Sequence, residues 1–436
     1  MRQDQSKTAN TKVSVAETVL NEGTPAHAEA EAANFDRREA RELLRKLTIV
    51  FHHAGGGHQS AADAIRTILT GQDHPWDVTL LDIQELLDPL DLVRRFTGLR
   101  IQDTYNLILR RGWTRFTPQL LKVLQGTIRA YHAPIVKALR AYWEEHPADL
   151  VLSVIPHFNR ELADSLRGNG KKTPFATLIT DLADYPPRFW IERNSEYIIT
   201  GTERAKQQAL AIGHAAAHVF ETSGMVLKPK FYERKFDDAT DVDRASERKR
   251  FGLEPDCLTG IVLFGGHGSH VMTDIVRRLD QSGVEVQLIL ICGHNQKLEA
   301  KLKALPARKP KLVLGFTQNV EHYMAMADFF IGKPGPGSIS EALQFHLPVI
   351  VECNGKTLPQ ERYNAEWVAE KGFGVVVPSF RKIAPAVQRL TEPSTFNEIR
   401  RNTSTYSNRA LFEVSAILDK CYQGAEAGEI SMTQRA

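Results

Sequence analysis

The chain contains 436 residues, enough for two or three domains of ordinary size, each with its own core. Hydrophobic residues make up 42% of it and charged residues 25%, which argues against a fibrous or wholly disordered chain. The formal net charge is only +3, and no apolar run approaches the roughly 18 residues that a membrane-spanning helix needs.

The N-terminal extension, residues 1–45, has no apolar core of the kind found in signal peptides. It is polar and aperiodic up to an Ala/Glu/Arg-rich run at 27–46. We predict that this extension is disordered or helical and contributes little to the folded core.

A first α/β domain is predicted over residues 46–225. Ala61, Ile65 and Leu69 recur every four residues, which predicts a helix over 59–70. Short apolar runs that predict buried strands lie at 47–52, 78–81, 149–155, 174–180 and 196–200. Strands that alternate with helices favour a parallel sheet covered on both faces.

A charged linker is predicted over 226–257, where no strand pattern occurs. It contains Asp241 and Asp243, whose Asp-x-Asp spacing holds a divalent metal in some sugar-nucleotide enzymes. Because no strand precedes this pair, and no other cluster has zinc spacing, we predict no metal site.

A second series of strands and helices predicts another doubly wound domain over 258–404. Its predicted strands are 260–264, 284–292, 311–314, 329–331, 347–351 and 375–377, and its helices lie near 270–282, 295–304, 319–327, 338–346 and 362–371. A final helix over 405–423 is expected to pack back on the first domain, and 424–436 is predicted to be a tail. Two such domains place a ligand at the carboxyl ends of their strands, in a cleft.

The first candidate motif is Gly55-Gly56-Gly57-His58, between a predicted strand and a predicted helix. Consecutive glycines let the backbone approach a ligand, and the helix N-terminus favours negative charge. His58 at the helix start is a candidate general base. The alternative is a tight turn that happens to carry a histidine.

The second motif, Gly-Gly-His-Gly-Ser-His at 265–270, occupies the corresponding place in the second domain. Gly266 and Gly268 offer backbone donors, and Ser269 offers a hydroxyl. A tight turn is again the alternative, but glycine loops at matching positions in both halves indicate a shared ligand cleft.

The third motif, at 331–343, is a Gly/Pro loop followed by a predicted helix. The N–H groups of Gly337, Ser338 and Ile339 are candidate donors to a diphosphate. Glu341 lies one turn further and can accept hydrogen bonds from both ribose hydroxyls. Ser338 and Glu341 also fit a capping box, which is the structural alternative.

The segment 314–343, with Phe316, Lys333, the loop 335–337 and Glu341, resembles the C-terminal signature of monogalactosyldiacylglycerol synthases and bacterial diacylglycerol glucosyltransferases. These are relatives of the peptidoglycan-precursor N-acetylglucosaminyltransferase. The resemblance extends over roughly 47–420 and includes the 55–58 loop and Thr180-Asp181.

The resemblance implies the GT-B fold, in which two Rossmann-like domains face each other, and inverting transfer of a hexose from a UDP-sugar to a lipid hydroxyl, without cofactor or metal. It implies that either His58 or Asp181 is the base, and that Trp190 belongs to the acceptor loop. The donor roles that it implies are the ribose for Glu341, the diphosphate for Lys228 and the 337–339 amides, the uracil for Phe316, and the donor sugar for Gln360 and Glu361.

Two departures from the family pattern bear on the prediction. His294 stands where family members have an arginine, and the loop 182–190 lacks the histidine that lipid-acting members carry before a tryptophan. The missing histidine keeps open a non-catalytic nucleotide-sugar or lipid-binding protein of the same fold. A UDP-sugar epimerase, which shares the fold and a nucleotide site but needs no lipid, is a second alternative.

The segment 94–140 contains ten Lys/Arg residues and one acidic residue. Aromatic residues are interleaved with this charge and continue to Trp143, a pattern that suits docking on an anionic bilayer, although these apolar side chains also suit a core. The predicted membrane contacts are Arg110, Arg111, Trp113 and Arg115. The segment has no recognised nucleic-acid motif, and four unpaired cysteines favour the cytoplasm, so we predict a peripheral protein on the cytoplasmic face of a membrane.

Overall fold

A computed structural model describes residues 44–53, 56–71, 74–88, 125–167, 173–233 and 241–433, with the side chains of 241–243 and 426–433 excepted. The chain divides into two units, Met1–Leu44 and Arg45–Ala436, and the described residues belong to the second unit apart from Leu44. Residues 1–43 of the predicted N-terminal extension lie outside the described part of the chain.

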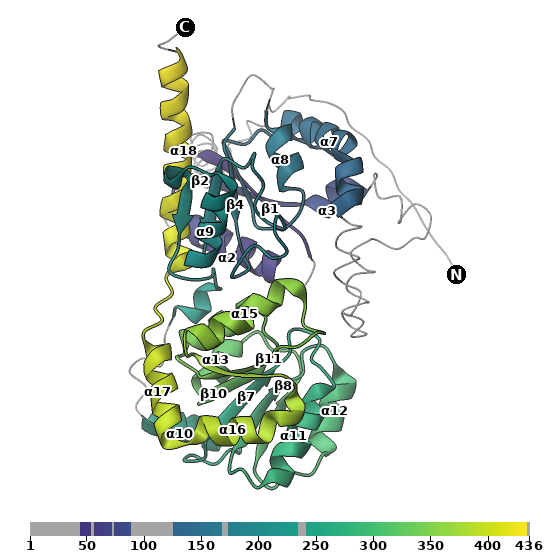
Figure 1. Cartoon of the computed structure of the whole chain (residues 1–436), viewed down its shortest axis with the longest axis vertical. Coiled ribbons are helices and arrows are strands. Elements are labelled where there is room, and N and C mark those ends of the chain that lie inside the picture. The colour runs from purple at the N-terminus through teal and green to yellow at the C-terminus, as the bar shows by residue number, and fades with distance from the viewer. Residues whose placement is uncertain are drawn as a thin grey trace, which may run out of the picture. The chain divides into compact units, whose positions relative to one another are not determined.

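The first half contains a six-stranded parallel sheet in the order β2-β1-β3-β4-β5-β6. Helices lie around this sheet (Figure 1). The strands are β1 (Arg45–Phe51), β2 (Trp76–Asp82), β3 (Leu150–Ser153), β4 (Phe175–Leu178), β5 (Tyr197–Thr200) and β6 (Val219–Glu221). The helices are α2 (Gly57–Gly71), α3 (Ile83–Leu87), α7 (His132–Glu145), α8 (Asn159–Ser165) and α9 (Glu203–Ile212), with short 3₁₀ turns η3 (Ala216–His218) and η4 (Pro229–Phe231).

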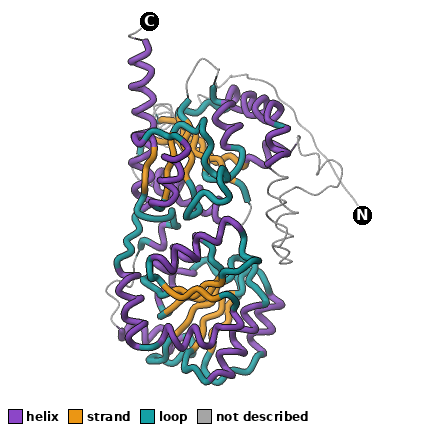
Figure 2. Tube along the Cα trace, in the orientation of Figure 1, coloured by secondary structure: helices purple, strands orange, loops and turns teal. Residues whose placement is uncertain are grey.

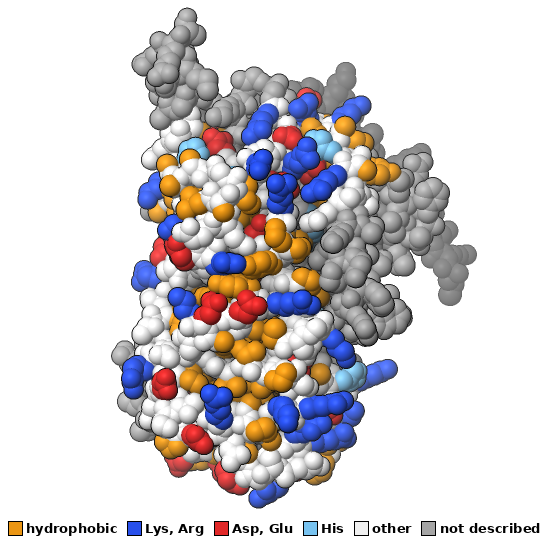
Figure 3. Space-filling view, viewed as in Figure 1, with side chains coloured by type: hydrophobic (Ala, Val, Ile, Leu, Met, Phe, Trp, Pro, Cys, Tyr) orange, Lys and Arg blue, Asp and Glu red, His pale blue; other side chains and the backbone are white. Residues whose placement is uncertain are grey.

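The second half contains another six-stranded parallel sheet, in the order β12-β11-β10-β7-β8-β9. Helices surround its strands (Figure 2), and basic and acidic side chains are interspersed on the face seen in Figure 3. Its strands are β7 (Thr259–Leu263), β8 (Gln287–Ile291), β9 (Lys311–Leu314), β10 (Phe329–Gly332), β11 (Val349–Glu352) and β12 (Gly374–Val377). Its helices are α10 (Asp241–Arg250), α11 (Val271–Ser282), α12 (Gln296–Ala304), α13 (Val320–Ala325), α14 (Pro336–Gln344), α15 (Pro359–Glu370), α16 (Ile383–Thr391) and α17 (Pro393–Ser404), with the 3₁₀ turn η5 (Phe380–Lys382).

Strand order fixes where each sheet can bind a ligand. In the first sheet β1 lies between β2 and β3, and in the second sheet β7 lies between β10 and β8, so the strand order reverses beside β1 and beside β7. The loops that leave the carboxyl ends of the strands diverge at such a reversal and open a crevice. The predicted glycine motifs follow β1, β7 and β10, the strands that meet at these two points.

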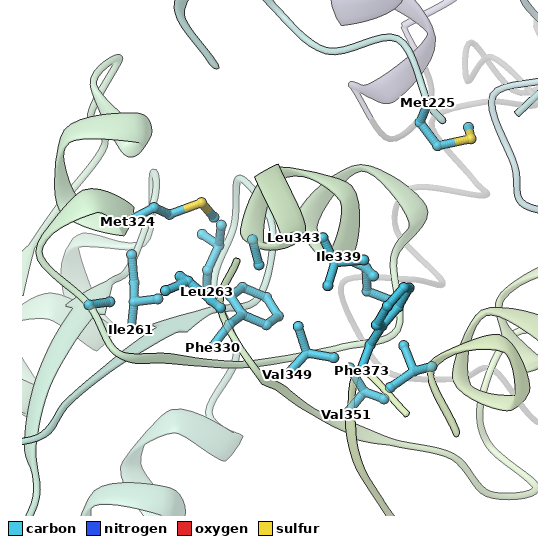
Figure 4. Close-up of a cluster of buried hydrophobic side chains, with 14 of the residues drawn as sticks. Met225, Ile261, Leu263, Met324, Phe330, Ile339, Leu343, Val349, Val351 and Phe373 are labelled. Carbon is cyan, nitrogen blue, oxygen red and sulfur yellow. The ribbon is translucent and has the colours of Figure 1, made fainter. Parts of the chain in front are cut away.

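Apolar burial holds each sheet between helices. Every residue of β3, β4, β7, β8 and β10 is buried, as expected for a parallel sheet covered on both faces. In the second half, side chains of β7, β10 and β11 pack against those of α14 in one apolar cluster (Figure 4). This packing fixes the first turn of α14, and the rest of its buried face, against the sheet.

A long C-terminal helix, α18 (Ala410–Thr433), returns to the first half. Its residues Leu411, Val414 and Leu418 are fully buried in the cluster that also contains Leu47 and other residues of the first sheet. The Trp76 indole donates a hydrogen bond to Asp419 at 3.0 Å. The helix begins five residues later than predicted and continues ten residues beyond the predicted limit of 423.

Other differences from the predicted elements have local causes. The strand β6 was not predicted because only two of its three residues, Val219 and Phe220, are apolar, which is too short a run to indicate a buried strand. The predicted linker contains α10, whose polar sequence gives no strong apolar stripe. The helix α14 begins at Pro336 rather than 338, because proline is well suited to the first helical position. No helix in the described part of the chain combines the length and apolar character needed to cross a membrane.

Candidate functional site

A cleft of about 2030 Å³ lies between the carboxyl ends of the two sheets and is lined by both halves of the second unit. Its walls include the loops that follow β1, β3 and β4 on one side, and β7, β8, β9 and β10 on the other. The predicted site residues that line it are Gly56, Gly57, His58, Asp181, Lys228, Gly266, Ser269, Phe316, Gly337, Ser338, Glu341, Gln360 and Glu361.

His58 lies at the start of α2, at the switch point of the first sheet. Its Nδ1 is 2.9 Å from the carbonyl oxygen of Val154, after β3, and 3.0 Å from the hydroxyl of Thr180, after β4. Because a carbonyl only accepts, Nδ1 carries the proton and the neutral ring keeps its lone pair on Nε2. The contacts therefore fix both the tautomer and the orientation of the imidazole.

Two further histidines surround His58. The His52 ring packs edge-on against it, with centroids 4.5 Å apart. Burial, and secondarily the His58 charge, lowers the pKa of His157 to about 4, and burial likewise lowers the pKa of His58 to about 4. The pKa of His52 lies well below its ordinary value for the same reasons. All three rings are thus neutral near pH 7, and an unprotonated nitrogen is present at His58.

Asp181, directly after Thr180, stands on the same wall. Its Oδ2 accepts a hydrogen bond from the Trp190 indole at 2.9 Å, and the Trp190 ring is 5.6 Å from that of His58. Burial raises the pKa of Asp181 to about 7; the Trp190 bond opposes the rise, and the charges of Glu361 and Asp184 add to it. Trp190 itself is fully buried and does not line the cleft. It therefore contacts Asp181 and His58 from the protein interior and helps to orient both side chains.

The first turn of α14 faces the cleft from the second half. Gly337 and Ser338 lie within the first three helical positions, whose N–H groups have no partner inside the helix. Ile339 was predicted as a third donor, and this is wrong: its amide donates to the Gly335 carbonyl at 3.1 Å and its side chain is fully buried. The capping-box alternative is wrong too, because Gly335 is the N-cap and no side chain caps the helix.

Glu341 lies further along α14, with its carboxyl group in the cleft wall. Burial raises its pKa to about 7, although the Lys228 ammonium lowers it in part, and the carboxylate of Glu321 raises it further. A carboxylate in such surroundings lacks partners that fully compensate its charge, so it is prepared to accept hydrogen bonds from a ligand.

Phe316 is 57% exposed and is the one exposed large hydrophobic side chain among the described residues. The ring of His294 stacks on it, with centroids 4.1 Å apart and an interplanar angle of 16°. His294, which departs from the family pattern, thus forms a stacked pair with Phe316 in the cleft wall. A planar base can stack on such a surface.

The loop after β7 is packed closely against the loop after β8. A Cβ on Gly293 would lie 2.2 Å from the Gly266 carbonyl oxygen, and a Cβ on Gly268 would lie 2.7 Å from the Cys292 carbonyl oxygen. Both glycines also have positive φ, 60° and 58°. This backbone contact explains the second glycine motif and brings Gly266 and Ser269 to the cleft.

Gln360 and Glu361 enter the cleft from the first turn of α15. The Oε1 of Glu361 is 2.9 Å from the Nζ of Lys333, which follows β10. Lys333 has no predicted role of its own, and His157 is not among the predicted site residues. Both follow a strand beside a switch point, and this position in the topology is the signal that finds them.

Several predicted features fall elsewhere. Gly55 and the predicted membrane contacts Arg110, Arg111, Trp113 and Arg115 lie outside the described residues. Trp143, included in the interleaved aromatic pattern, is buried in the first-half core and its indole donates to Ser165 at 2.9 Å, so it is not a membrane contact.

The Asp241/Asp243 pair falls in the first turn of α10, in the part whose side chains are not described. Elsewhere in the described part of the chain, no group of three His, Cys, Asp or Glu side chains has an arrangement that could hold a metal ion.

Comparison with known proteins gives a family match in each half. Residues 58–226 match the family model "Monogalactosyldiacylglycerol (MGDG) synthase", and residues 261–411 match "Glycosyltransferase family 28 C-terminal domain". The monogalactosyldiacylglycerol synthase of Spinacia oleracea, a chloroplastic protein, is 26% identical over 82% of this chain and 68% of its own length. The corresponding synthase 1 of Arabidopsis thaliana is 27% identical over 80% of this chain and 66% of its own. The chain thus spans about two thirds of these relatives.

Solved structures share the fold at low sequence identity. MurG of Acinetobacter baumannii has a TM-score of 0.55 at 13% identity, over 86% of this chain and 99% of that one. The UDP-GlcNAc 2-epimerase of Neisseria meningitidis has a TM-score of 0.55 at 15% identity, over 86% and 100%. The predicted two-domain GT-B fold is confirmed. The solved structure of the glycotransferase of kitacinnamycin has a TM-score of 0.53 at 14% identity, close to that of the epimerase, so the fold alone does not choose between the two activities.

Proposed function

Because the chain belongs to the monogalactosyldiacylglycerol synthase family of glycosyltransferases, we propose that it transfers a hexose from a UDP-sugar to the hydroxyl of a diacylglycerol-type lipid, with inversion at the sugar. One observation supports this most strongly. Two candidate proton-transfer side chains, His58 and Asp181, share a cleft with a helix N-terminus, a buried carboxyl group and an exposed aromatic ring.

The donor nucleotide is assigned to the second half. Phe316, backed by His294, offers its open face to the uracil, and Glu341 accepts hydrogen bonds from the ribose hydroxyls. The diphosphate is placed at the first turn of α14, where the Gly337 and Ser338 amides and the Lys228 ammonium meet its charge. Gly266 and Ser269 contribute from the loop after β7.

The donor sugar is assigned to Gln360 and Glu361, at the start of α15. The Lys333 ammonium, paired with Glu361, stands beside them and adds positive charge near the bond that breaks. Carboxylate and amide side chains suit recognition of sugar hydroxyls by direct hydrogen bonds. Their placement on a helix rather than a flexible loop favours a fixed sugar orientation.

His58 is the proposed base in the transfer step. Its Nε2 takes the acceptor proton while the acceptor oxygen bonds to the anomeric carbon and the bond from that carbon to UDP breaks. The electron pair leaves with UDP, whose charge is neutralised by Lys228 and the α14 amides. Asp181, ionised, supplies negative charge near the imidazolium that forms, as an orienting carboxylate does in other base-assisted reactions.

The acceptor is assigned to the first half, in the part of the cleft bounded by Gly56, Gly57 and the loop with Asp181. The match of residues 58–226 to a lipid-galactosylating family supports a lipid hydroxyl there. We further propose that the protein is peripheral at an anionic membrane surface, on the cytoplasmic face, through the arginine-rich part of the segment 94–140.

The test is incubation of the protein with UDP-glucose and UDP-galactose, each with diacylglycerol in mixed micelles, followed by mass spectrometry of the lipid fraction. The expected product is a monohexosyl lipid, absent when His58→Ala replaces the native protein. Conversion of one UDP-sugar to its epimer without added lipid would instead favour the epimerase alternative. UDP-sugar binding with no product of either kind would favour the non-catalytic alternative.

A further inference from the structure

The loop of residues 181–190, called here the Asp181 loop, is closed by its own side chains. The Asp184 carboxylate accepts N–H groups from Arg188, Phe189 and Trp190, at 2.8, 2.9 and 2.7 Å. The Trp190 indole N–H in turn donates a hydrogen bond to the Asp181 carboxylate at 2.9 Å. The position of the Asp181 carboxylate is therefore set by how this loop as a whole is held.

The helix α9 of the first half is joined to the Asp181 loop by side-chain hydrogen bonds. Gln208 forms two hydrogen bonds with the Asp184 backbone, accepting from its amide at 2.8 Å and donating to its carbonyl at 3.0 Å. One turn earlier, the Arg204 guanidinium donates to the Tyr185 hydroxyl at 2.5 Å. Because positions four apart share a helix face, both contacts come from one side of α9.

The same loop also contacts the second half. Leu182 and Ala183 are buried in an apolar cluster formed mainly by second-half residues. The Tyr185 ring lies 5.9 Å from the ring of Tyr363, and the Arg204 guanidinium lies 5.8 Å from the first ring centroid and 5.9 Å from the second. Tyr363 is buried in α15, the helix that carries the donor-sugar candidates Gln360 and Glu361.

From these contacts we infer that Tyr185, Arg204 and Tyr363 form a clamp between the two halves, which positions Asp181, and through Trp190 also His58, relative to the Lys333–Glu361 pair on the donor side. The three clamp residues touch no reacting atom, so they are positioning residues rather than catalytic ones. The inference rests on the proposed function for its consequence on rate, but the geometry it describes is testable without turnover.

The charges of the Lys333–Glu361 pair act on the Asp181 carboxyl group across the cleft. The pKa of Asp181 responds to Glu361, which raises it, and to Lys333, which lowers it, both from the second half. Within the Asp181 loop, Trp190 lowers it and Asp184 raises it, while burial has the largest effect. Loosening the clamp admits water to the carboxyl group and moves these charges away, so the pKa of Asp181 should fall towards its ordinary value.

The test replaces the second-half member of the clamp. Tyr363→Ala removes the ring, Tyr363→Phe keeps it, and Tyr142→Ala removes a ring that stacks on His146 at 4.4 Å in α7 and serves as the matched control. In ¹H–¹⁵N spectra, the Trp190 indole resonance, assigned with Trp190→Phe, reports ionisation of Asp181 through their hydrogen bond. In the native protein it should titrate near pH 7.

In Tyr363→Ala, the indole titration should move down by about one pH unit, because the carboxyl group regains water. The kcat for lipid glycosylation should fall roughly 10- to 100-fold, the usual effect of small displacements of reacting groups, while the Kd for UDP changes less than about threefold. Tyr363→Phe and Tyr142→Ala should behave like the native protein in all three measurements.

An unchanged indole titration and an unchanged kcat in folded Tyr363→Ala would overturn the clamp. A loss of UDP affinity as large as the loss of kcat would also overturn it, because α15 would then simply be deformed. If Tyr363→Ala does not fold, Arg204→Gln, which removes the guanidinium between the rings, undergoes the same measurements with the same expected shifts. A shifted indole titration in a protein that glycosylates no lipid would retain the clamp and refute the proposed function.

Discussion

Glu341→Ala tests the assignment of the donor site most directly. At pH 8 the native carboxyl group, with a pKa of about 7, is mainly ionised and can accept a charge-assisted hydrogen bond from each ribose hydroxyl. Such bonds contribute ~1.5–3 kcal/mol each, but ionising a buried carboxyl group offsets part of this, so we expect a net loss of ~2–3 kcal/mol. At ~1.4 kcal/mol for each factor of ten, UDP-sugar affinity should fall roughly 30- to 150-fold.

The same pKa predicts how affinity depends on pH. The ionised carboxylate is a stronger acceptor than the protonated carboxyl group, so native affinity should rise as pH rises through 7, by up to about tenfold between pH 6 and pH 8. Glu341→Gln keeps an acceptor oxygen but does not titrate, and its affinity should be intermediate and independent of pH. A UDP-sugar is a suitable ligand because its diphosphate does not titrate in this range.

Isothermal titration calorimetry of the folded variants with UDP-glucose, without lipid, measures these affinities. Glu321→Ala is the matched control, because Glu321 also lines the cleft but lies on α13 rather than α14. It should bind the donor as well as the native protein or slightly better, since its charge raises the pKa of Glu341. Native affinity in Glu341→Ala, or an equal loss in Glu321→Ala, would refute the ribose assignment.

Four other predictions address the rest of the cleft and its surroundings. Phe316→Ala should weaken UDP-glucose binding by ~0.5–1.5 kcal/mol in calorimetry, the usual value of an aromatic stack, and Phe316→Trp should restore it; equal binding in all three proteins would exclude the base from this ring. At saturating donor, kcat should rise as pH rises through about 7 because Asp181 must be ionised, and Asp181→Asn should be slower without this rise, whereas a native rate that is flat from pH 6 to 8 would remove Asp181 from the step. Glycosyltransferase activity should persist in EDTA, because the α14 amides and Lys228 stabilise the negative charge of the leaving UDP; a loss of activity that magnesium reverses would show a metal requirement. Changing the three arginines of the predicted membrane contact to Glu should release the protein from anionic liposomes in sedimentation assays without changing UDP affinity, and unaltered co-sedimentation would contradict the membrane assignment.

Apolar runs and Gly/Pro motifs in the sequence were sufficient to predict two α/β domains with parallel sheets. Of the twelve strands in the described part of the chain, eleven contain apolar runs that predict them, and the Gly/Pro motifs mark the turns where strands meet helices. The match of 314–343 to a known signature then gave the family, the GT-B fold and the class of enzyme, all of which are confirmed. Strands, helices and turns can be predicted from short segments because backbone preference and apolar periodicity are properties of neighbouring residues.

Errors occurred where a local pattern had two physical outcomes. Ser338 and Glu341 have capping-box spacing, but Pro336 starts the helix earlier and leaves the Ile339 amide bonded within it. Trp143 follows a basic segment, as a membrane contact would, but the helix α7 turns it into the core. In the first case a nearby proline decides the outcome, and in the second case tertiary packing decides it.

The sequence by itself determined which chemical groups are present: a histidine after a glycine loop, a carboxyl group after a strand, and another within a helix. Only the tertiary structure decided their protonation and their partners. The neutral tautomer of His58 depends on Val154, 96 positions away, and the raised pKa of Asp181 depends on burial and on charges from the other half. Desolvation and Coulomb interactions act through space, so groups distant in the chain set them once the two sheets face each other across the cleft.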